Sequence, residues 1–440
     1  MSPASNEFAE TPPVFHPACS LDFLPADQLH SLQSQRLRQT LRHACDHIGL
    51  VARRFEKHGL TPADIRGIED LHRLPFTSRE DLRGAYPLGM LAVPPDQVAR
   101  LHAAPAPGGR PLMVPHTHAD LQAWHDLLTR ALAGCGIRAG DVVQNVSAYS
   151  LFTDPLGLHQ AAEALGAMVV PSAAAEGARQ LAILKDFGVS VVCAAPAYFL
   201  HLVEQAERAD VDWSRLPLRL GVLVDEPCSE ANRRRIEKAV GIKVYGLFGL
   251  PEIIGRGIGA ECCRQDGIHL FEDHFYPEVV EPETGAPLPA GQEGELVLTT
   301  LKRQALPLIR YRTGGRALLV PEPCACGRTL RRIRPVPSSR PRAYVVEGVQ
   351  VLAEQIEAVL SAVEGSLPPY RIVRAAGPDE LEVQIEVTPQ IFRDQVGAME
   401  GLQNRLAQEI ARVAGVRVPV RFVEPHSITR WQAPPAGPAG

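Results

Sequence analysis

The spacing of apolar residues divides the chain into a helical beginning, an alternating middle and a later β-rich stretch. Apolar positions at helical intervals predict an amphipathic helix over residues 29–59, and Ser78 before Glu80 and Asp81 predicts a capped helix start. From residue 120 onward, helices alternate with short apolar runs, which is typical of crossover connections and a mostly parallel sheet. The predicted order is helix 120–135, strand 141–148, helix 158–165, buried strand 167–171, helix 177–187 and strand 189–194.

The pattern changes again after Glu261, where alternating apolar residues favour antiparallel strands. A proline-rich run that ends at Pro341 cannot hold a regular element, so we place a domain boundary there. We expect an α/β fold with a large N-terminal domain over residues 1–336, which includes a β-rich subdomain, and a small α+β domain over residues 342–428. Residues 431–440 are rich in Pro, Ala and Gly and predict a disordered tail.

The composition excludes two broad classes of protein. The 45 Lys and Arg residues against 50 Asp and Glu residues give a net charge of −5, which excludes a strongly basic nucleic-acid binder. No apolar run approaches the roughly 18–20 residues that span a bilayer, and no polybasic block indicates binding to a membrane. The N-terminal stretch is polar, without the apolar core of a signal peptide, so we expect a cytoplasmic protein. Lysines are few, and none follows Lys302.

Seven segments carry long motifs: residues 74–81, 181–188, 261–270, 272–278, 294–300, 305–313 and 324–332. These motifs resemble those of phenylacetate–coenzyme A ligases, which belong to the adenylate-forming superfamily. The resemblance implies a large N-terminal domain and a small C-terminal lid. It also implies the family chemistry, in which a carboxylate and ATP form an acyl-adenylate that coenzyme A then attacks. ATP or AMP, magnesium and coenzyme A are the cofactors and co-substrates that such chemistry requires.

The residues that would hold the ATP phosphates depart from the family pattern. The family loop carries hydroxyl groups and a lysine, because backbone N–H groups, hydroxyls and a positive charge together bind phosphate oxygens. Residues 102–110 have no hydroxyl, contain two prolines, and place Arg110 where the lysine would stand. A plain surface turn is the alternative interpretation of this stretch.

The nucleotide-side motif is also altered. It contains Phe248, Gly249 and Glu252, and the carboxylate that the family places near magnesium is kept. Pro251 replaces the serine whose hydroxyl would contact phosphate. The adjoining turn keeps Glu226 but has a β-branched valine where backbone should approach the adenine base.

Three further family positions differ. The ribose-binding aspartate is replaced by Gly315, and the hinge into the lid has opposite charges at 340–342 and 347. The catalytic lysine of the lid is missing, and Arg430 is the nearest cation to its expected position. Removing one preorganised donor typically slows a reaction about 10²–10³-fold, so we expect several such losses to remove most adenylation.

A set of cysteine and histidine residues predicts a metal site. Cys324 and Cys326 form a Cys-x-Cys-Gly knuckle that directs two thiolates at one ion, and Cys262 with His269 would complete a tetrahedral zinc site. The resemblance implies the same four ligands, because family members with this pattern hold zinc. Four protein ligands leave no position for water, so the zinc would be structural. Reduced core cysteines are the alternative, and Cys263 is a spare.

Residues 149–157 resemble the family segment that binds the carboxylate substrate. Tyr149 and Phe152 could line a pocket for an aryl or acyl carboxylate, and the alternative is that both are core aromatics. Three functions stay open. The first is a non-catalytic relative that binds a ligand or a protein partner, such as an active homologue. The second is a working aryl- or acyl-CoA ligase in which Arg110 and Arg430 replace the lysines. The third is an acyl-transfer enzyme that uses a preactivated acyl group, although no dedicated nucleophile is recognisable.

Overall fold

The computed structural model describes residues 16–104, 111–147, 155–172, 177–224 and 228–336, followed by shorter stretches at 343–346, 349–352, 356, 359–360, 368–374, 381–387, 396–414, 416–424 and 428. The chain separates into two compact units, Met1–Val336 and Pro337–Gly440. Each unit is described by itself.

The N-terminal unit begins with helices. They are η1 (Pro17–Phe23), α1 (Ala26–His47), α2 (Gly49–Lys57), η2 (Pro62–Asp64), η3 (Ile68–Arg73), α3 (Arg79–Gly84) and η4 (Pro95–Gln97). The single helix predicted over residues 29–59 is wrong, because Ile48 takes an extended conformation and buries its side chain, which separates α1 from α2. The predicted capped start is confirmed, since the Ser78 side chain accepts a hydrogen bond from the Asp81 amide and the Asp81 carboxylate accepts one from the Ser78 amide.

An 11-stranded sheet forms the centre of this unit, in the order β10-β11-β12-β13-β9-β8-β7-β6-β5-β3-β4. Its strands are β3 (Val142–Asn145), β4 (Met168–Pro171), β5 (Val191–Ala194), β6 (Leu220–Leu223), β7 (Lys243–Leu250), β8 (Gly255–Glu261), β9 (Ile268–Leu270), β10 (Phe275–Val280), β11 (Glu293–Thr300), β12 (Tyr311–Val320) and β13 (Arg332–Pro335). Strands β4, β3, β5, β6 and β7 are parallel, and every pairing from β7 to β10 is antiparallel. The expected parallel pairing in the alternating stretch and the expected antiparallel pairing after Glu261 are both confirmed, but the change of direction comes slightly earlier than expected, where β8 pairs with β7 before Glu261.

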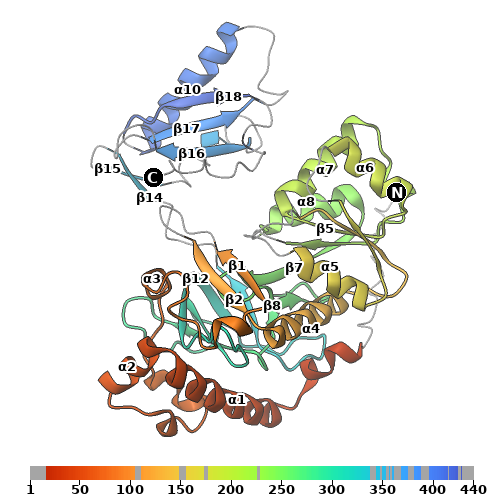
Figure 1. The fold of residues 1–440 in the computed structure, drawn as a ribbon. Coiled ribbons are helices and arrows are strands. Elements are labelled where there is room, and N and C mark those ends of the chain that lie inside the picture. The colour runs from red at the N-terminus through yellow and green to blue at the C-terminus, as the bar shows by residue number, and fades with distance from the viewer. Residues whose placement is uncertain are drawn as a thin grey trace. The chain divides into compact units, whose positions relative to one another are not determined.

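Helices and a hairpin pack around the sheet (Figure 1). The helices are α4 (His118–Gly134), α5 (Pro155–Ala164), α6 (Gly177–Asp186), α7 (Pro196–Arg208), η5 (Trp213–Arg215) and α8 (Glu230–Val240), and the hairpin is β1 (Arg100–Ala104) with β2 (Leu112–His116). Helix α4 contacts α5 and β8, and α7 lies between α6 and α8. Strand β4 was predicted to be buried, but it lies at the sheet edge and Met168 is 52% exposed.

The C-terminal unit is a small α+β structure, as expected from its sequence. It contains the hairpin β14 (Ala343–Val346) and β15 (Val349–Leu352), the strands β16 (Tyr370–Arg374), β17 (Leu381–Glu386) and β18 (Val420–Val423), and helix α10 (Val396–Ala414). Its core joins apolar side chains of β17 and α10, including Val383, Ile385, Leu406 and Ile410. Within the described ranges of both units, no helix is long and apolar enough to cross a membrane.

Candidate functional site

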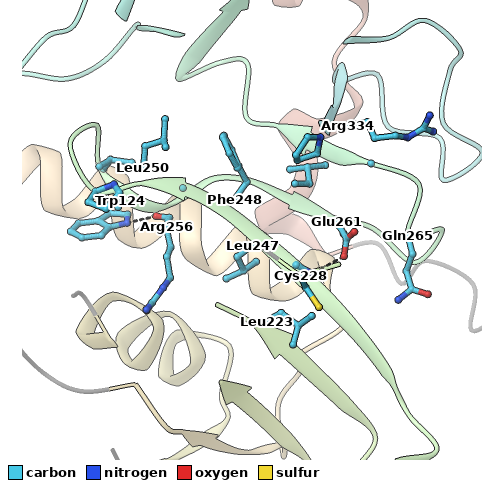
Figure 2. A pocket seen from close by; sticks show the side chains of 18 of the residues that line it. Trp124, Leu223, Cys228, Leu247, Phe248, Leu250, Arg256, Glu261, Gln265 and Arg334 are labelled. Atoms are coloured by element: carbon cyan, nitrogen blue, oxygen red, sulfur yellow. Dashed lines mark hydrogen bonds between the residues drawn. The ribbon is translucent and has the colours of Figure 1, made fainter. Parts of the chain in front are cut away.

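A cavity of about 750 Å³ runs along β7 in the N-terminal unit (Figure 2). Apolar side chains from β6, β7 and the following turn cover part of its wall: Leu223, Leu247, Phe248, Leu250 and Ile254. Polar side chains gather elsewhere in the wall: Arg233, Glu261, Gln265, Asp266 and Arg334. Figure 2 shows Trp124 and Leu250 at one end, and Gln265 and Arg334 at the other. A mostly apolar cavity with a few polar groups is the usual form of a small-molecule site.

Three rings form the end of the cavity at Trp124. The His116 ring stacks on Trp124 with centroids 5.0 Å apart, and His102 meets His116 edge-on at 5.5 Å. The Arg303 guanidinium donates to His116 Nδ1 at 3.0 Å. Because a guanidinium only donates, the neutral His116 ring must carry its proton on Nε2. Burial, and then the Arg303 charge, lower the pKa of His116 well below its usual value, so this ring is a neutral donor.

The Nε2–H group of His116 is buried and has no hydrogen-bond partner in the described part of the chain. An oxygen atom of a ligand would satisfy this donor. Sequence reasoning missed His116, Trp124 and Arg303, because they belong to separate elements and no motif links them. The nearest signal was the closeness of His116 in sequence to the loop over residues 102–110, and Arg303 had no such signal.

The nucleotide-side motif forms the end of β7. Phe248 and Gly249 lie in the cavity wall, as expected for a motif that faces a ligand. A Cβ atom at Gly249 would lie 2.1 Å from the carbonyl oxygen of Gly255, so only glycine fits between β7 and β8 here. Glu252 is only 4% exposed, and Tyr311 Oη donates to its Oε1 at 3.0 Å. Burial and then the Glu252 charge raise the pKa of Tyr311, so the phenol stays protonated.

The arginines near the expected ribose site are held by protein groups. Arg310 binds Glu278 through two nitrogen atoms at 2.9 and 3.0 Å, and Arg312 binds Glu295. Gly315 follows on β12, and it offers no side-chain acceptor for ribose hydroxyls. These contacts give both arginines a structural role in the β-rich part of the sheet.

The four predicted metal ligands lie together. One ligand atom from each of Cys262, His269, Cys324 and Cys326 falls within 4.8 Å of the others, and all but Cys324 are at most 6% exposed. We call these residues the cysteine–histidine cluster. The Sγ atoms of Cys262 and Cys324 are 3.7 Å apart, and a tetrahedral zinc site with bonds of about 2.3 Å has edges of about 3.8 Å. The donor set and its dimensions therefore fit zinc.

Neighbouring groups prepare the cluster for a cation. His269 Nδ1 donates to the carbonyl oxygen of Leu330 at 3.0 Å, so Nε2, which lies 3.4 Å from Cys326 Sγ, is the nitrogen that faces the cluster. A hydrogen bond from the Cys262 thiol lowers the pKa of Cys326 to about 2 and favours the thiolate. Arg328 donates to Asp22 at 2.7 Å and also contacts Cys326, so a positive charge faces the thiolates.

Some predicted site residues lie outside the described residues. They are Tyr149 and Phe152 of the carboxylate segment, Glu226 of the adenine-side turn, Arg110 of the phosphate loop, and Arg430 at the expected lid position.

Family models and relatives agree with this architecture. The model of the AMP-binding enzyme matches residues 108–301, and that of the AMP-binding enzyme C-terminal domain matches residues 348–434. The fold is thus that of an adenylate-forming enzyme. A phenylacetate-coenzyme A ligase of Thermus thermophilus is 39% identical over 425 residues, covering 93% of this chain and 96% of that protein. The ligase of the same name from Escherichia coli is 36% identical over 408 residues, covering 92% of this chain and 93% of that protein. The chain belongs to the phenylacetate–coenzyme A ligase family.

A solved structure shows a similar architecture. The 2-hydroxyisobutyryl-CoA ligase, in its postadenylation state with R3-HIB-AMP, superposes with a TM-score of 0.75 at 27% identity. The match covers 97% of this chain and 94% of that chain.

Proposed function

We propose that this protein binds an aryl or acyl carboxylate ligand in the cavity along β7 but does not carry out ATP-dependent ligation. The observation that supports the proposal best is the position of Glu252. Of the two family carboxylates that the nucleotide side keeps, Glu252 is the one that the structure describes, and it is buried against Tyr311 instead of lining the cavity. Pro251 and Gly315 provide no side-chain group for phosphate or ribose.

The cavity itself supports ligand binding. Its aromatic and aliphatic wall suits the body of an aryl or acyl group, and the buried Nε2–H of His116 suits a carboxylate or carbonyl oxygen. A bound acid would therefore place its oxygen atoms near His116 and its apolar part along β7. The protein would act as a binding protein, alone or beside a protein partner such as an active homologue.

We also propose that the cysteine–histidine cluster holds one structural zinc ion through Cys262, His269, Cys324 and Cys326. Free thiol ligands suit a reducing compartment, so the cytoplasm remains the proposed location. The C-terminal unit, with the lid expected over residues 342–428, is assigned no catalytic lysine because none follows Lys302.

A working ligase is the second candidate, and the names of the curated relatives at 36–39% identity favour it. In that function, Arg110 and Arg430 would replace the family lysines, and Glu252 would bind magnesium. The two candidates differ in one measurable step, the release of pyrophosphate.

The test measures pyrophosphate release from ATP–Mg²⁺ with phenylacetate, benzoate and short fatty acids, together with calorimetry of each acid alone. We expect binding of at least one acid without pyrophosphate. His116→Phe should weaken that binding, since it removes the donor and keeps a ring on Trp124. Arg430→Lys alone should not start adenylation, because the phosphate and ribose groups would still be missing. Acid-dependent pyrophosphate that falls in Arg430→Ala would establish the second candidate.

A further inference from the structure

The cysteine–histidine cluster and the cavity share one segment of chain. Cys262 and His269 belong to the cluster, and Gln265, Asp266 and Ile268 between them line the cavity. The backbone turns sharply here, with a positive φ of 50° at Gln265 and a hydrogen bond of 2.9 Å from its amide to the Cys262 carbonyl. One wall of the cavity is therefore a turn whose two ends are the proposed metal ligands. We call residues 262–269 the ligand turn.

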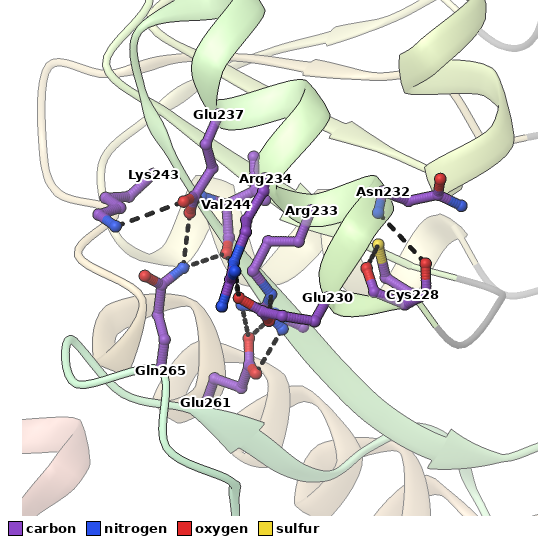
Figure 3. A network of polar contacts seen from close by, with 12 residues as sticks. Cys228, Glu230, Asn232, Arg233, Arg234, Glu237, Lys243, Val244, Glu261 and Gln265 are labelled. Carbon is purple, nitrogen blue, oxygen red and sulfur yellow. Dashed lines mark hydrogen bonds and ion pairs between the residues drawn. The ribbon is translucent and has the colours of Figure 1, made fainter. Parts of the chain in front are cut away.

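Gln265 joins the ligand turn to the strand that carries the nucleotide-side motif (Figure 3). Its Nε2 atom donates to the Val244 carbonyl of β7 at 2.8 Å and to Glu237 of α8 at 2.7 Å. Glu237 in turn accepts a hydrogen bond from the Val244 amide at 3.0 Å. The single side chain of Gln265 thus connects the turn with both α8 and β7.

Glu261, which directly precedes the first metal ligand, makes a second connection. Its carboxylate accepts hydrogen bonds from two nitrogen atoms of Arg233 at 2.6 and 2.8 Å, and from the Gly246 amide at 2.6 Å. All three residues line the cavity, and Glu261 is only 7% exposed. A buried, bidentate pair of this kind fixes the relative positions of its elements, because moving one partner leaves a buried charge unpaired.

The other two ligands come from a distant part of the chain. Cys324 and Cys326 lie between β12 and β13, so a bound ion would cross-link that segment to the ligand turn. Cross-links of this kind restrict the motion of the segments that they join. Through Gln265 and Glu261, the restriction would extend to β7 at Val244 and Gly246.

We infer that metal binding at the cysteine–histidine cluster orders the cavity wall formed by the ligand turn and β7, so that metal and ligand binding are coupled. The inference rests on the metal part of the proposed function. Coupling between two sites is reciprocal, and it typically changes equilibria about 5–150-fold. A ligand in the cavity should therefore also slow the loss of the metal. Gln265 acts as a positioning residue, since it touches neither the ion nor the reacting groups.

The test is amide hydrogen exchange of the full-length chain before and after metal removal by a chelator, with the metal content measured beforehand. Metal removal should raise exchange of the amides of Val244 and Gly246 about 5–150-fold. Strands β3 and β5, in the parallel part of the same sheet, are the internal reference, and exchange of their amides should rise much less than that of Val244 and Gly246.

Gln265→Asn is the matched variant. Asparagine tolerates the left-handed backbone, but its shorter side chain cannot reach Val244 as Gln265 does. We expect the variant to keep its metal and to show a smaller exchange response in β7.

Three results would overturn the inference. Increased exchange confined to residues 262–269 and 324–330 would make the metal a local structural element only. An equal rise in β3 and β5 would indicate global unfolding instead of coupling. Protein that contains no metal would overturn both this inference and the proposed zinc site, whereas metal-containing protein with either of the first two results would overturn this inference alone.

Discussion

The cysteine–histidine cluster and the nucleotide side of the cavity lie at opposite ends of β8, yet they keep their family residues to different extents. The cluster has its four ligands within 4.8 Å, with a backbone carbonyl on the histidine and Arg328 beside the thiolates. On the nucleotide side, Glu252 remains but is bound to Tyr311, and Pro251 and Gly315 stand where we expect a donor and an acceptor from the family resemblance.

The difference shows that a fold and its chemistry depend on separate residues. The cluster joins β9 with segments beside β8 and β13, so its loss would destabilise the sheet itself. Side chains that bind the phosphates and the ribose would stabilise only a bound ligand, and the core of this chain packs without them. The same scaffold can therefore keep its structural site while its nucleotide site changes.

The largest effect should come from removal of the metal site. Cys326→Ser should lose about one equivalent of zinc and destabilise the N-terminal unit by more than about 4 kcal/mol, since loss of a metal is among the largest effects of single substitutions. Elemental analysis and urea unfolding would measure both effects. Cys263→Ser is the control, because Cys263 is the adjacent thiol outside the cluster, and it should keep its metal. Unchanged stability of metal-free protein would contradict the structural role.

The next largest effect concerns Arg310, the residue directly before β12. Arg310 is 3% exposed, binds Glu278 through two nitrogen atoms, and donates to the Leu74 carbonyl at 2.7 Å. Arg310→Ala should cost about 3–5 kcal/mol, because it leaves a buried carboxylate unpaired. Chemical unfolding would measure the loss in free energy of unfolding. Arg316→Ala is the control, because the Arg316 side chain is more exposed. A stable Arg310→Ala protein with altered ligand binding would assign Arg310 to the site instead.

A smaller effect is expected at Glu252. Glu252→Gln should change stability by less than about 1 kcal/mol, because the amide oxygen still accepts the hydrogen bond from Tyr311. Thermal unfolding with and without magnesium would measure the change. If the variant removed a magnesium-dependent increase in the midpoint, Glu252 would be a metal-binding carboxylate and the nucleotide site would be functional.

The smallest expected effect is that of the nucleotide itself. ATP–Mg²⁺ at about 1 mM should barely change the unfolding midpoint, because ligand stabilisation follows RT ln(1 + [L]/Kd) and vanishes when Kd greatly exceeds the ligand concentration. Zinc-loaded and chelated protein should respond alike. A shift of several degrees would show that Arg110 and other groups have rebuilt the site.

Features that depend on near neighbours in the chain could be predicted. The Ser78 cap follows from a serine three residues before an aspartate, and the Cys-x-Cys-Gly spacing indicated two metal ligands. The break at Ile48 could not be predicted, since the apolar spacing continues across it. The exact strand at which pairing becomes antiparallel was also hidden, because an apolar run does not reveal which strand will pair with it.

The superfamily architecture and the four members of the cysteine–histidine cluster could be inferred from the sequence alone, because they depend on which residues are present and on short spacings. The same reasoning predicts losses at the phosphate loop and Gly315. The surroundings of Glu252, His116 and the ligand turn follow only from the folded chain. Tyr311 donates a hydrogen bond to Glu252, which lies 59 residues away in the sequence. Arg303 fixes the tautomer of His116 from 187 residues away, and Gln265 binds Val244 of β7 from 21 residues away. Each of these contacts needs the sheet to assemble first, since no local preference brings such distant groups together.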